Sequence, residues 1–197
     1  MIFKNTILRN KLKNLAKKFP EVEDILLFGS VVRGKVRPAD IDIMVLFKKA
    51  VNKNAEYKIR KELEKYYKNI SIISKTKNSV IEPTFDARES ILFEGISLIS
   101  RKNLAKQYGF DSLGMFKYDL KKLNNTGKTK FYYALNGRSG SQGILDILNG
   151  IKLSDNIIFT NIDKIEPMKE FLDSWKINYI YTPLLIPNRM NNKKILQ

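Results

Sequence analysis

The feature that most constrains this chain is a pair of short apolar segments separated by a polar stretch that begins with glycine. Ile25–Phe28 is a run of large apolar side chains that stops at Gly29, and Ile41–Phe47 is a second such run. Apolar runs of this length, bounded by turn residues, are typical of strands buried within a sheet. We therefore expect two strands of a buried sheet, joined by a turn and a short helix.

Helices and strands are expected to alternate along the first hundred residues. Amphipathic helical spacing occurs over residues 5–19, before the first strand, and over residues 54–68, after the second. A strand over 70–74, a helix over 85–93 and a closing strand over 95–99 follow. This alternation predicts an α/β domain at residues 1–100.

The second half of the chain predicts a smaller α/β domain at residues 101–186. The expected elements are two helices and two strands, over residues 128–136, 166–175, 157–162 and 177–186. The remaining segment, 187–197, is polar and basic, and we expect it to be a flexible tail.

Composition limits the chemistry that the chain can perform. Lys and Arg total 36 and Asp and Glu total 20, which gives a formal net charge of +16. Such a surface attracts polyanions, so nucleotides and nucleic acids are candidate partners, but genome composition or heat adaptation explains a lysine-rich surface equally well. The chain has no cysteine and no histidine, which excludes thiolate nucleophiles, imidazole bases and the usual zinc ligands. Any catalysis must therefore use carboxylates, hydroxyls, lysine, arginine or bound metal.

No segment of the sequence suggests a membrane or a secretory route. The first residues lack the apolar core of a signal peptide, and no stretch reaches about 18 uninterrupted apolar residues. We therefore expect a soluble cytoplasmic protein with no membrane partner. The sequence leaves its oligomeric state open.

Two acidic residues, Asp40 and Asp42, stand at the beginning of the second apolar run. Because side chains alternate across a strand, both acids project from one face, and Ile41 and Ile43 project from the other. Two carboxylates on one face repel each other unless a cation lies between them. Oxygen ligands suit Mg²⁺ or Mn²⁺, and Mg²⁺ usually combines one or two carboxylates with phosphate oxygens. The pair therefore predicts a Mg²⁺ (or Mn²⁺) site that a nucleoside triphosphate would complete.

Phosphate-binding groups are expected on the turn after the first strand. Gly29 lets the backbone approach a ligand closely, and Ser30 offers a hydroxyl and an amide at the start of the expected short helix. Arg33 follows one helical turn after Ser30, where its charge suits a phosphate. We therefore expect these residues to bind the nucleotide.

This segment resembles the signature of the polymerase beta nucleotidyltransferase superfamily, which is Gly-Ser, roughly ten residues, and then Asp-x-Asp. The minimal archaeal and bacterial members, including the antitoxin partners of HEPN toxins, have a Gly-Ser-x-x-Arg-Gly pattern that residues 29–34 match. Residues 91–95, Ile-Leu-Phe-Glu-Gly, are also similar to the end of the family domain. The resemblance covers roughly residues 20–100. It implies an α+β domain with a mixed sheet flanked by helices.

The resemblance also implies an activity. A nucleoside monophosphate would be transferred from a triphosphate to a hydroxyl of a nucleic acid or a protein, with pyrophosphate as the leaving group. Asp40 and Asp42 would be the catalytic metal ligands, and Gly29, Ser30 and Arg33 would bind the nucleotide. Two other functions remain open: a catalytically degenerate protein that binds nucleotides or nucleic acids, and an antitoxin that modifies a partner toxin.

One position departs from the family pattern. The family has a third carboxylate on the strand after the long helix, where this chain has Ser71. Glu82 and Asp86 are candidates to replace it, but both are expected near the start of the next helix, where each has a simpler role as a solvated or first-turn charge. Catalysis with two metal ions about 3.5–4 Å apart depends on such a carboxylate more than nucleotide binding does.

Positive charge concentrates after the predicted first domain. Between residues 101 and 138, nine Lys and Arg accompany two Asp and Glu, whereas residues 139–197 have seven and six. Aromatic residues are interleaved with these lysines, as in proteins that bind single-stranded nucleic acid by following its backbone and stacking its bases. The alternative is that the rings lie in the core and the lysines in water. The candidates for nucleic-acid binding are Lys121, Lys122, Lys128, Lys130 and Arg138.

Overall fold

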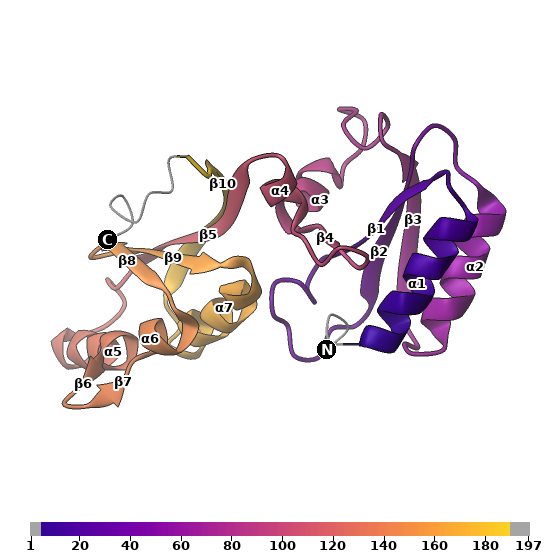
Figure 1. Cartoon of the computed structure of the whole chain (residues 1–197). Helices are drawn as coiled ribbons and strands as arrows, with labels where there is room; N and C mark the ends of the chain where they lie inside the picture. Colours follow the sequence, from indigo (N-terminus) through magenta and orange to yellow (C-terminus); the bar gives the residue numbers. More distant parts are fainter. Residues whose placement is uncertain (1–4, 190–197) are drawn as a thin grey trace. The chain divides into compact units, whose positions relative to one another are not determined.

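The computed structural model of the chain describes residues 5–189 and consists of two compact units (Figure 1). The first unit extends to Tyr108 and the second begins at Gly109. The short segment Arg33–Lys35 groups with the second unit. The part of the predicted tail from residue 190 onward lies outside the described residues.

The first unit ends after the predicted boundary at residue 100. The reason is a short helix, α4 (Leu104–Gln107), whose first amide donates to the carbonyl oxygen of Gly95 at 2.7 Å. The Leu104 side chain is buried in the same apolar cluster as Ile91. Residues 101–108 therefore complete the core of the first unit.

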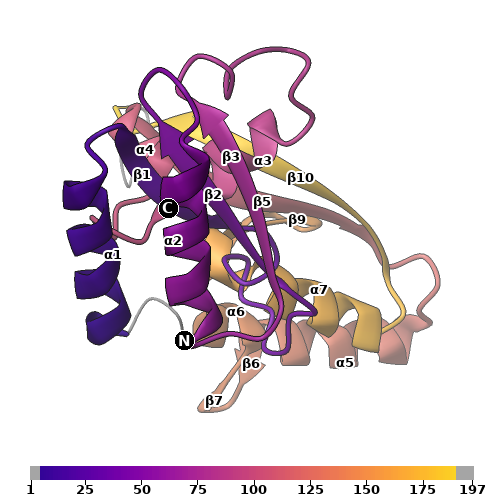
Figure 2. The same cartoon turned by 90° about the vertical axis from the view of Figure 1, so that its right-hand side faces the viewer.

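A four-stranded mixed sheet forms the centre of the first unit. Its strands are β1 (Val22–Phe28), β2 (Ile41–Phe47), β3 (Ile70–Thr76) and β4 (Ile96–Ser97), in the order β3-β2-β1-β4. Strand β1 is antiparallel to β2 and to β4, and β2 is parallel to β3. The mixed sheet flanked by helices that the sequence predicts is confirmed (Figures 1 and 2). Besides α4, the helices of this unit are α1 (Thr6–Lys18), α2 (Lys53–Glu64) and α3 (Arg88–Glu94).

Both faces of this sheet are buried. Leu26 and Met44 lie in a cluster with Ile91 of α3. Their neighbours Leu27 and Ile43 are equally buried and must face the other way, because adjacent residues in a strand point to opposite faces. Helices α1 and α2 lie side by side against that second face (Figures 1 and 2). Burial on both faces explains why the sequences of β1 and β2 contain continuous runs of apolar residues.

The prediction of a short helix after the first strand is wrong. Residues 30–34 form hydrogen-bonded turns, in which the Val32 amide donates to the carbonyl oxygen of Gly29 at 3.1 Å. Gly34 has a φ of +93°, which a right-handed helix cannot contain, and Pro38 follows shortly after it. Ser30 therefore stands in a turn and not at a helix N-terminus.

The second unit contains a four-stranded antiparallel sheet with strand order β10-β5-β9-β8. This agrees with the predicted C-terminal α/β region. Its elements are β5 (Phe110–Asp119), α5 (Asn125–Asn136), β6 (Gly137–Arg138), β7 (Ser141–Gln142), α6 (Ile144–Leu148), β8 (Ile151–Ser154), β9 (Ile157–Asn161), the 3-10 helix η2 (Ile162–Lys164), α7 (Ile165–Ser174) and β10 (Asn178–Pro187). Of the helices in residues 5–189, none has the length and apolar character needed to cross a membrane.

Strand β5 was not expected from the sequence, although it lies inside the second sheet. Its alternation is clear in the structure, since Phe116 and Tyr118 are buried and Lys117 and Asp119 are exposed. The sequence allowed two interpretations of the aromatic residues, base stacking at the surface or burial in the core. For this strand, burial in the core is the one that holds. Strand β10 lies at the edge of the sheet, where Pro183 can be accommodated without an amide hydrogen.

Candidate nucleotide-binding site

The carboxylate of Asp42 packs directly on the turn that follows β1. Asp42 is half-buried in β2 and pairs with Phe28, the residue before Gly29. A Cβ atom added to Gly29 would lie 2.2 Å from Asp42 Oδ2, and the φ of Gly29 is +80°. Only glycine fits this position, because it supplies both the space and the backbone conformation.

A second carboxylate, that of Glu94, fixes the same turn. Glu94 is the last residue of α3, is only 5% exposed, and accepts a hydrogen bond from the Gly29 amide at 2.7 Å. The sequence pattern gave no separate role to Glu94, although it is the acidic residue of the segment from Ile91 to Gly95. Because the Gly29 amide already donates to Glu94, phosphate binding at this turn would fall to the hydroxyl and amide of Ser30.

Asp40 lies in a bend just before β2 and is exposed. Pairing with the neighbouring strand region begins directly after it, where the Ile41 amide donates to the carbonyl oxygen of Asn69 at 3.0 Å. Ile43, two residues further on, is fully buried. The acidic pair therefore combines one carboxylate in solvent with one that is half-buried against Gly29.

No third carboxylate joins this pair in the described part of the chain. Ser71 of β3 is the register partner of Asp42, so it occupies the position where the family pattern has an acid. Glu82 and Asp86 are exposed and lie in the bend and turn region before α3. Within residues 5–189, no group of three or more Asp, Glu, His or Cys could hold a metal ion. Two carboxylate donors together with phosphate oxygens still match the ligand set that Mg²⁺ accepts.

Arg33 has a different environment from the one expected for a phosphate ligand. It belongs to the second unit, where its Nε donates to Glu166 Oε1 at 2.8 Å and its carbonyl oxygen accepts from the Glu166 amide at 3.0 Å. Burial raises the pKa of Glu166, but the hydrogen bond from Arg33 and the charge of Lys169 outweigh it and bring the pKa below its ordinary value. Glu166 is therefore ionised at neutral pH and balances the charge of Arg33.

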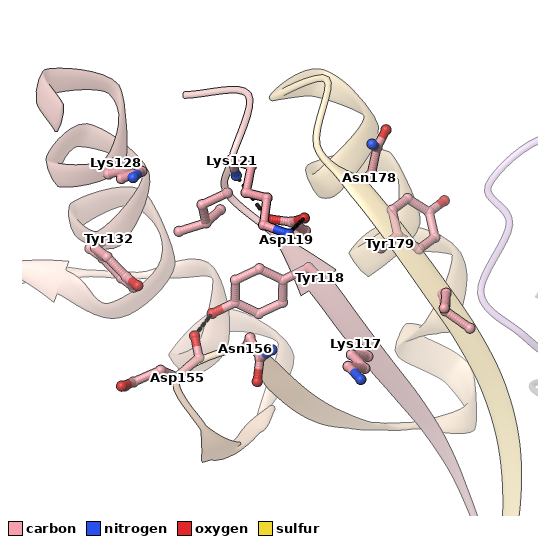
Figure 3. A pocket seen from close by; sticks show the side chains of 12 residues that line it. Lys117, Tyr118, Asp119, Lys121, Lys128, Tyr132, Asp155, Asn156, Asn178 and Tyr179 are labelled. Carbon is pink, nitrogen blue, oxygen red and sulfur yellow. Dashed lines mark hydrogen bonds and ion pairs between the residues drawn. The ribbon is translucent and has the colours of Figure 1, made fainter. Parts of the chain in front are cut away.

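The candidate nucleic-acid-binding residues fall into two groups. Lys121 and Lys128 line a cavity of about 830 Å³ in the second unit (Figure 3), and Lys122 Nζ donates to Asn178 Oδ1, on the cavity wall, at 2.8 Å. Lys130 and Arg138 do not line it. The Arg138 guanidinium instead lies 4.5 Å from the centre of the Tyr133 ring. The structure therefore brings together only part of the predicted basic set.

Comparison with known families assigns the first unit. Residues 10–104 match the family described as polymerase beta, nucleotidyltransferase. This range contains the mixed sheet, the Gly29 turn and both aspartates. Residues 10–104 are thus a nucleotidyltransferase domain of the polymerase beta family, as the resemblance implied.

Three solved structures illustrate which members of this class are similar to the chain. One is the MntA–HpeT toxin–antitoxin in mutant form, with 20% identity over 46% of this chain and 70% of that chain, at a TM-score of 0.34. The second is a toxin–antitoxin with AMP-PNP, with 22% identity over 46% and 71% of the two chains, also at 0.34. The third is tri-AMPylated Shewanella oneidensis HEPN toxin in complex with MNT antitoxin, with 20% identity over 47% and 69%, at 0.31. No curated protein matches the sequence significantly.

Proposed function

We propose that the first unit transfers a nucleoside monophosphate from a nucleoside triphosphate to a hydroxyl group. The observation that carries this proposal is the Asp42 carboxylate packed over Gly29, inside a domain of the nucleotidyltransferase family. Because Gly29 has no side chain, the turn and the carboxylate approach each other closely, and phosphates bound at Ser30 would lie near a cation held by Asp42. In the reaction, the hydroxyl oxygen forms a bond to the α-phosphorus, the bond to the β-phosphate oxygen breaks, and pyrophosphate leaves.

Each residue of the site has a separate role in this proposal. Asp40 and Asp42 hold Mg²⁺, which when bound neutralises charge on the phosphate oxygens. The hydroxyl and amide of Ser30 bind the outer phosphates. Gly29 keeps the turn close to Asp42, and Glu94 positions Gly29 through its amide. The attacking hydroxyl gives its proton to solvent, since Ser71 stands in register with Asp42, where a third catalytic carboxylate would be expected.

A specific observation favours a second candidate function, which is nucleotide binding without transfer. Ser71 stands in register with Asp42, so the position suited to a further metal ligand carries a hydroxyl. A reaction that uses two metal ions loses more from this replacement than the binding of a single Mg²⁺–triphosphate does. In this alternative, the same residues bind the nucleotide but no product forms.

One experiment separates these functions and also identifies the acceptor. The protein is incubated with α-³²P-labelled ATP, GTP, CTP or UTP and Mg²⁺, with either bulk RNA or cell extract as acceptor. We expect label to be transferred by the native protein and lost in Asp42→Asn, whereas Lys130→Ala, at an exposed position of the second unit, should retain transfer. Label on RNA would identify a nucleic-acid acceptor. Label on a protein would identify the acceptor that the antitoxin alternative predicts.

Nucleotide binding, measured by calorimetry with Mg²⁺ and a non-hydrolysable triphosphate, decides the remaining cases. Binding that is lost in Asp42→Asn, without transfer to any acceptor, would support the binding-only function. If the native protein neither binds nor transfers any of the four nucleotides, both functions are wrong.

A further inference from the structure

The cavity of the second unit lies outside the domain matched by the nucleotidyltransferase family, which ends at residue 104. Its volume is about 830 Å³, within the range of ligand sites. Four parts of the unit contribute to it: the end of β5, the start of β10, helix α5, and the turn between β8 and β9 (Figure 3). Nothing in the function proposed for the first unit uses this cavity.

Tyr118 is a fixed part of the cavity wall. The residue is 2% exposed, and its hydroxyl donates to the carbonyl oxygen of Asp155 at 2.6 Å. Its ring packs edge-on against Phe131 of α5, with ring centroids 5.5 Å apart. Burial raises the pKa of the phenol, so the side chain stays neutral. These contacts hold β5, α5 and the β8–β9 turn together. The wall of the cavity around Tyr118 is therefore preorganised.

Two further tyrosines line the cavity and are only half-buried. Tyr132 of α5 lies 6.0 Å from Phe131 between ring centroids, and Tyr179 of β10 lies 5.9 Å from Phe116. Each ring is therefore supported by a buried aromatic residue and still keeps exposed surface. Figure 3 shows the two side chains on different sides of the hollow. Supported, partly exposed rings are suited to stacking with planar groups.

The charges of the cavity favour an anionic ligand. Both acids that line it already interact with lysine: Asp119 with Lys121 at 3.7 Å, and Asp155 with Lys152 at 3.3 Å. The other two lining lysines, Lys117 and Lys128, have no carboxylate at ion-pair distance among the described residues. Two cations are therefore left to interact with a ligand.

We propose that this cavity binds single-stranded nucleic acid. Lys117 and Lys128 come from β5 and α5, so they suit phosphates spread along a strand better than one clustered group. Bases stack on Tyr132 and Tyr179, which is the combination used by proteins that bind single strands with little sequence preference. The amides of Asn156 and Asn178 line the same cavity and offer donors and acceptors to sugars or base edges. This inference does not depend on the transferase activity of the first unit.

The test measures binding of the full chain to fluorescein-labelled decauridylate by fluorescence anisotropy. We expect Lys128→Ala and Tyr132→Leu each to weaken binding at least about fivefold. Lys130→Ala is the matched control, because it removes the same charge from an exposed position of the same helix that does not line the cavity, and it should change affinity less than about twofold. Tyr132→Phe keeps the ring and should retain binding. Lys128→Ala should also reduce the slope of log affinity against log salt by roughly 0.7.

Three results would overturn the inference. The first is a loss in Lys130→Ala as large as that in Lys128→Ala, which would mean that charge acts diffusely over the surface. The second is unchanged binding by Tyr132→Leu, which would remove the stacking role. The third is tighter binding of an oligo-aspartate peptide, which would make the cavity a site for acidic protein segments. Asp42→Asn should bind decauridylate normally, so failure of this inference and failure of the transferase proposal are distinguishable.

Discussion

At the scale of single residues, the backbone of Gly29 is where the candidate site is assembled. Asp42 Oδ2 occupies the space where a Cβ would be, and Glu94 Oε2 accepts from the amide. The two carboxylates therefore interact with different atoms of one residue. Substitutions at Gly29 and Glu94 test these interactions separately.

Gly29→Ala should destabilise the protein and abolish nucleotide binding. The new methyl group would collide with Asp42, and the left-handed backbone adds strain of about 1–2 kcal/mol. Gly140→Ala is the matched control, because Gly140 has a φ of +88° but no atom within 4 Å of an added Cβ. In urea unfolding, the loss of stability should be larger for Gly29→Ala. Equal losses, with nucleotide binding retained, would mean that contact with Asp42 does not matter.

Glu94→Ala should lower the free energy of unfolding by about 1–3 kcal/mol, because the Gly29 amide would be buried without an acceptor. Glu94→Gln keeps an acceptor oxygen and should recover most of this loss. It should also recover the apparent affinity for the triphosphate, as expected of a residue that positions the turn. A glutamine variant as impaired as the alanine variant would show that the negative charge of Glu94 is what matters.

Asp24 should make stability depend on pH. Burial raises the pKa of this carboxyl above its ordinary value of 3.8, although the Ser97 hydroxyl and the Ile25 amide donate to it at 2.7 and 2.8 Å. The folded state then holds its proton more tightly than the unfolded state, so stability falls as pH rises from 3.8 through the raised pKa. Asp24→Asn keeps an acceptor and should remove this fall, which unfolding measured between pH 3.5 and 7 would detect. If the native protein loses no more stability than Asp24→Asn between pH 3.5 and 7, the prediction is wrong.

At the scale of elements, the register between β2 and β3 decides which side chain accompanies Asp42. Residues paired across neighbouring strands share a face and lie about 5 Å apart. The parallel pairing puts Ser71 in this place, and a shift of one residue would bring an isoleucine there instead. Local sequence suggested Ser71 for this position, and the register supports that assignment.

Ser71→Asp should restore a third carboxylate beside Asp42. Without metal, repulsion between the two acids should lower the melting temperature, and Mg²⁺ should raise it more than in the native protein. Ser71→Asn is the control, since it has similar size without the charge. Thermal unfolding with and without 5 mM Mg²⁺, a concentration of roughly the scale at which weak sites fill, measures the effect. No difference between the two variants in their response to Mg²⁺ would argue against metal binding at this face.

Helix α5 shows how one element serves both the core and a surface. Phe131 and Leu135 are buried, whereas Lys128 and Tyr132 line the cavity one turn apart. Lys130 projects elsewhere and is exposed. The sequence showed that lysine and aromatic residues are mixed along this helix. Which of them are buried, line the cavity or are exposed was decided only by the packing of α5 in the second unit.

At the scale of the whole molecule, the net charge of +16 opposes the compact state. The Debye length falls from about 30 Å at 0.01 M salt to about 8 Å at 0.15 M. Raising NaCl over this range should therefore increase the melting temperature by screening repulsion, while it weakens binding of decauridylate. Calorimetry at constant pH measures the first effect and anisotropy the second. A melting temperature that falls with NaCl would show that attractive ion pairs outweigh the net repulsion.

The sequence by itself determined the first unit to a large extent. Apolar runs predicted β1 and β2, since a strand buried on both faces needs no distant information to be recognised. Gly29 and Asp42 were expected to belong to one site, and they meet because antiparallel β1 and β2 place Phe28 opposite Asp42. The family resemblance covered the same region that the family comparison assigns.

Tertiary structure alone decided the rest. Glu94 reaches the Gly29 amide across 65 positions of sequence, and the cavity of the second unit is formed by residues from Lys117 to Ile180. The separation of Lys121 and Lys128 from Lys130 and Arg138 also depends on this packing. Periodicity shows which face of an element is apolar, but the partner of that face is selected by long-range packing among all the elements. Contacts between distant segments therefore could not be obtained from local pattern.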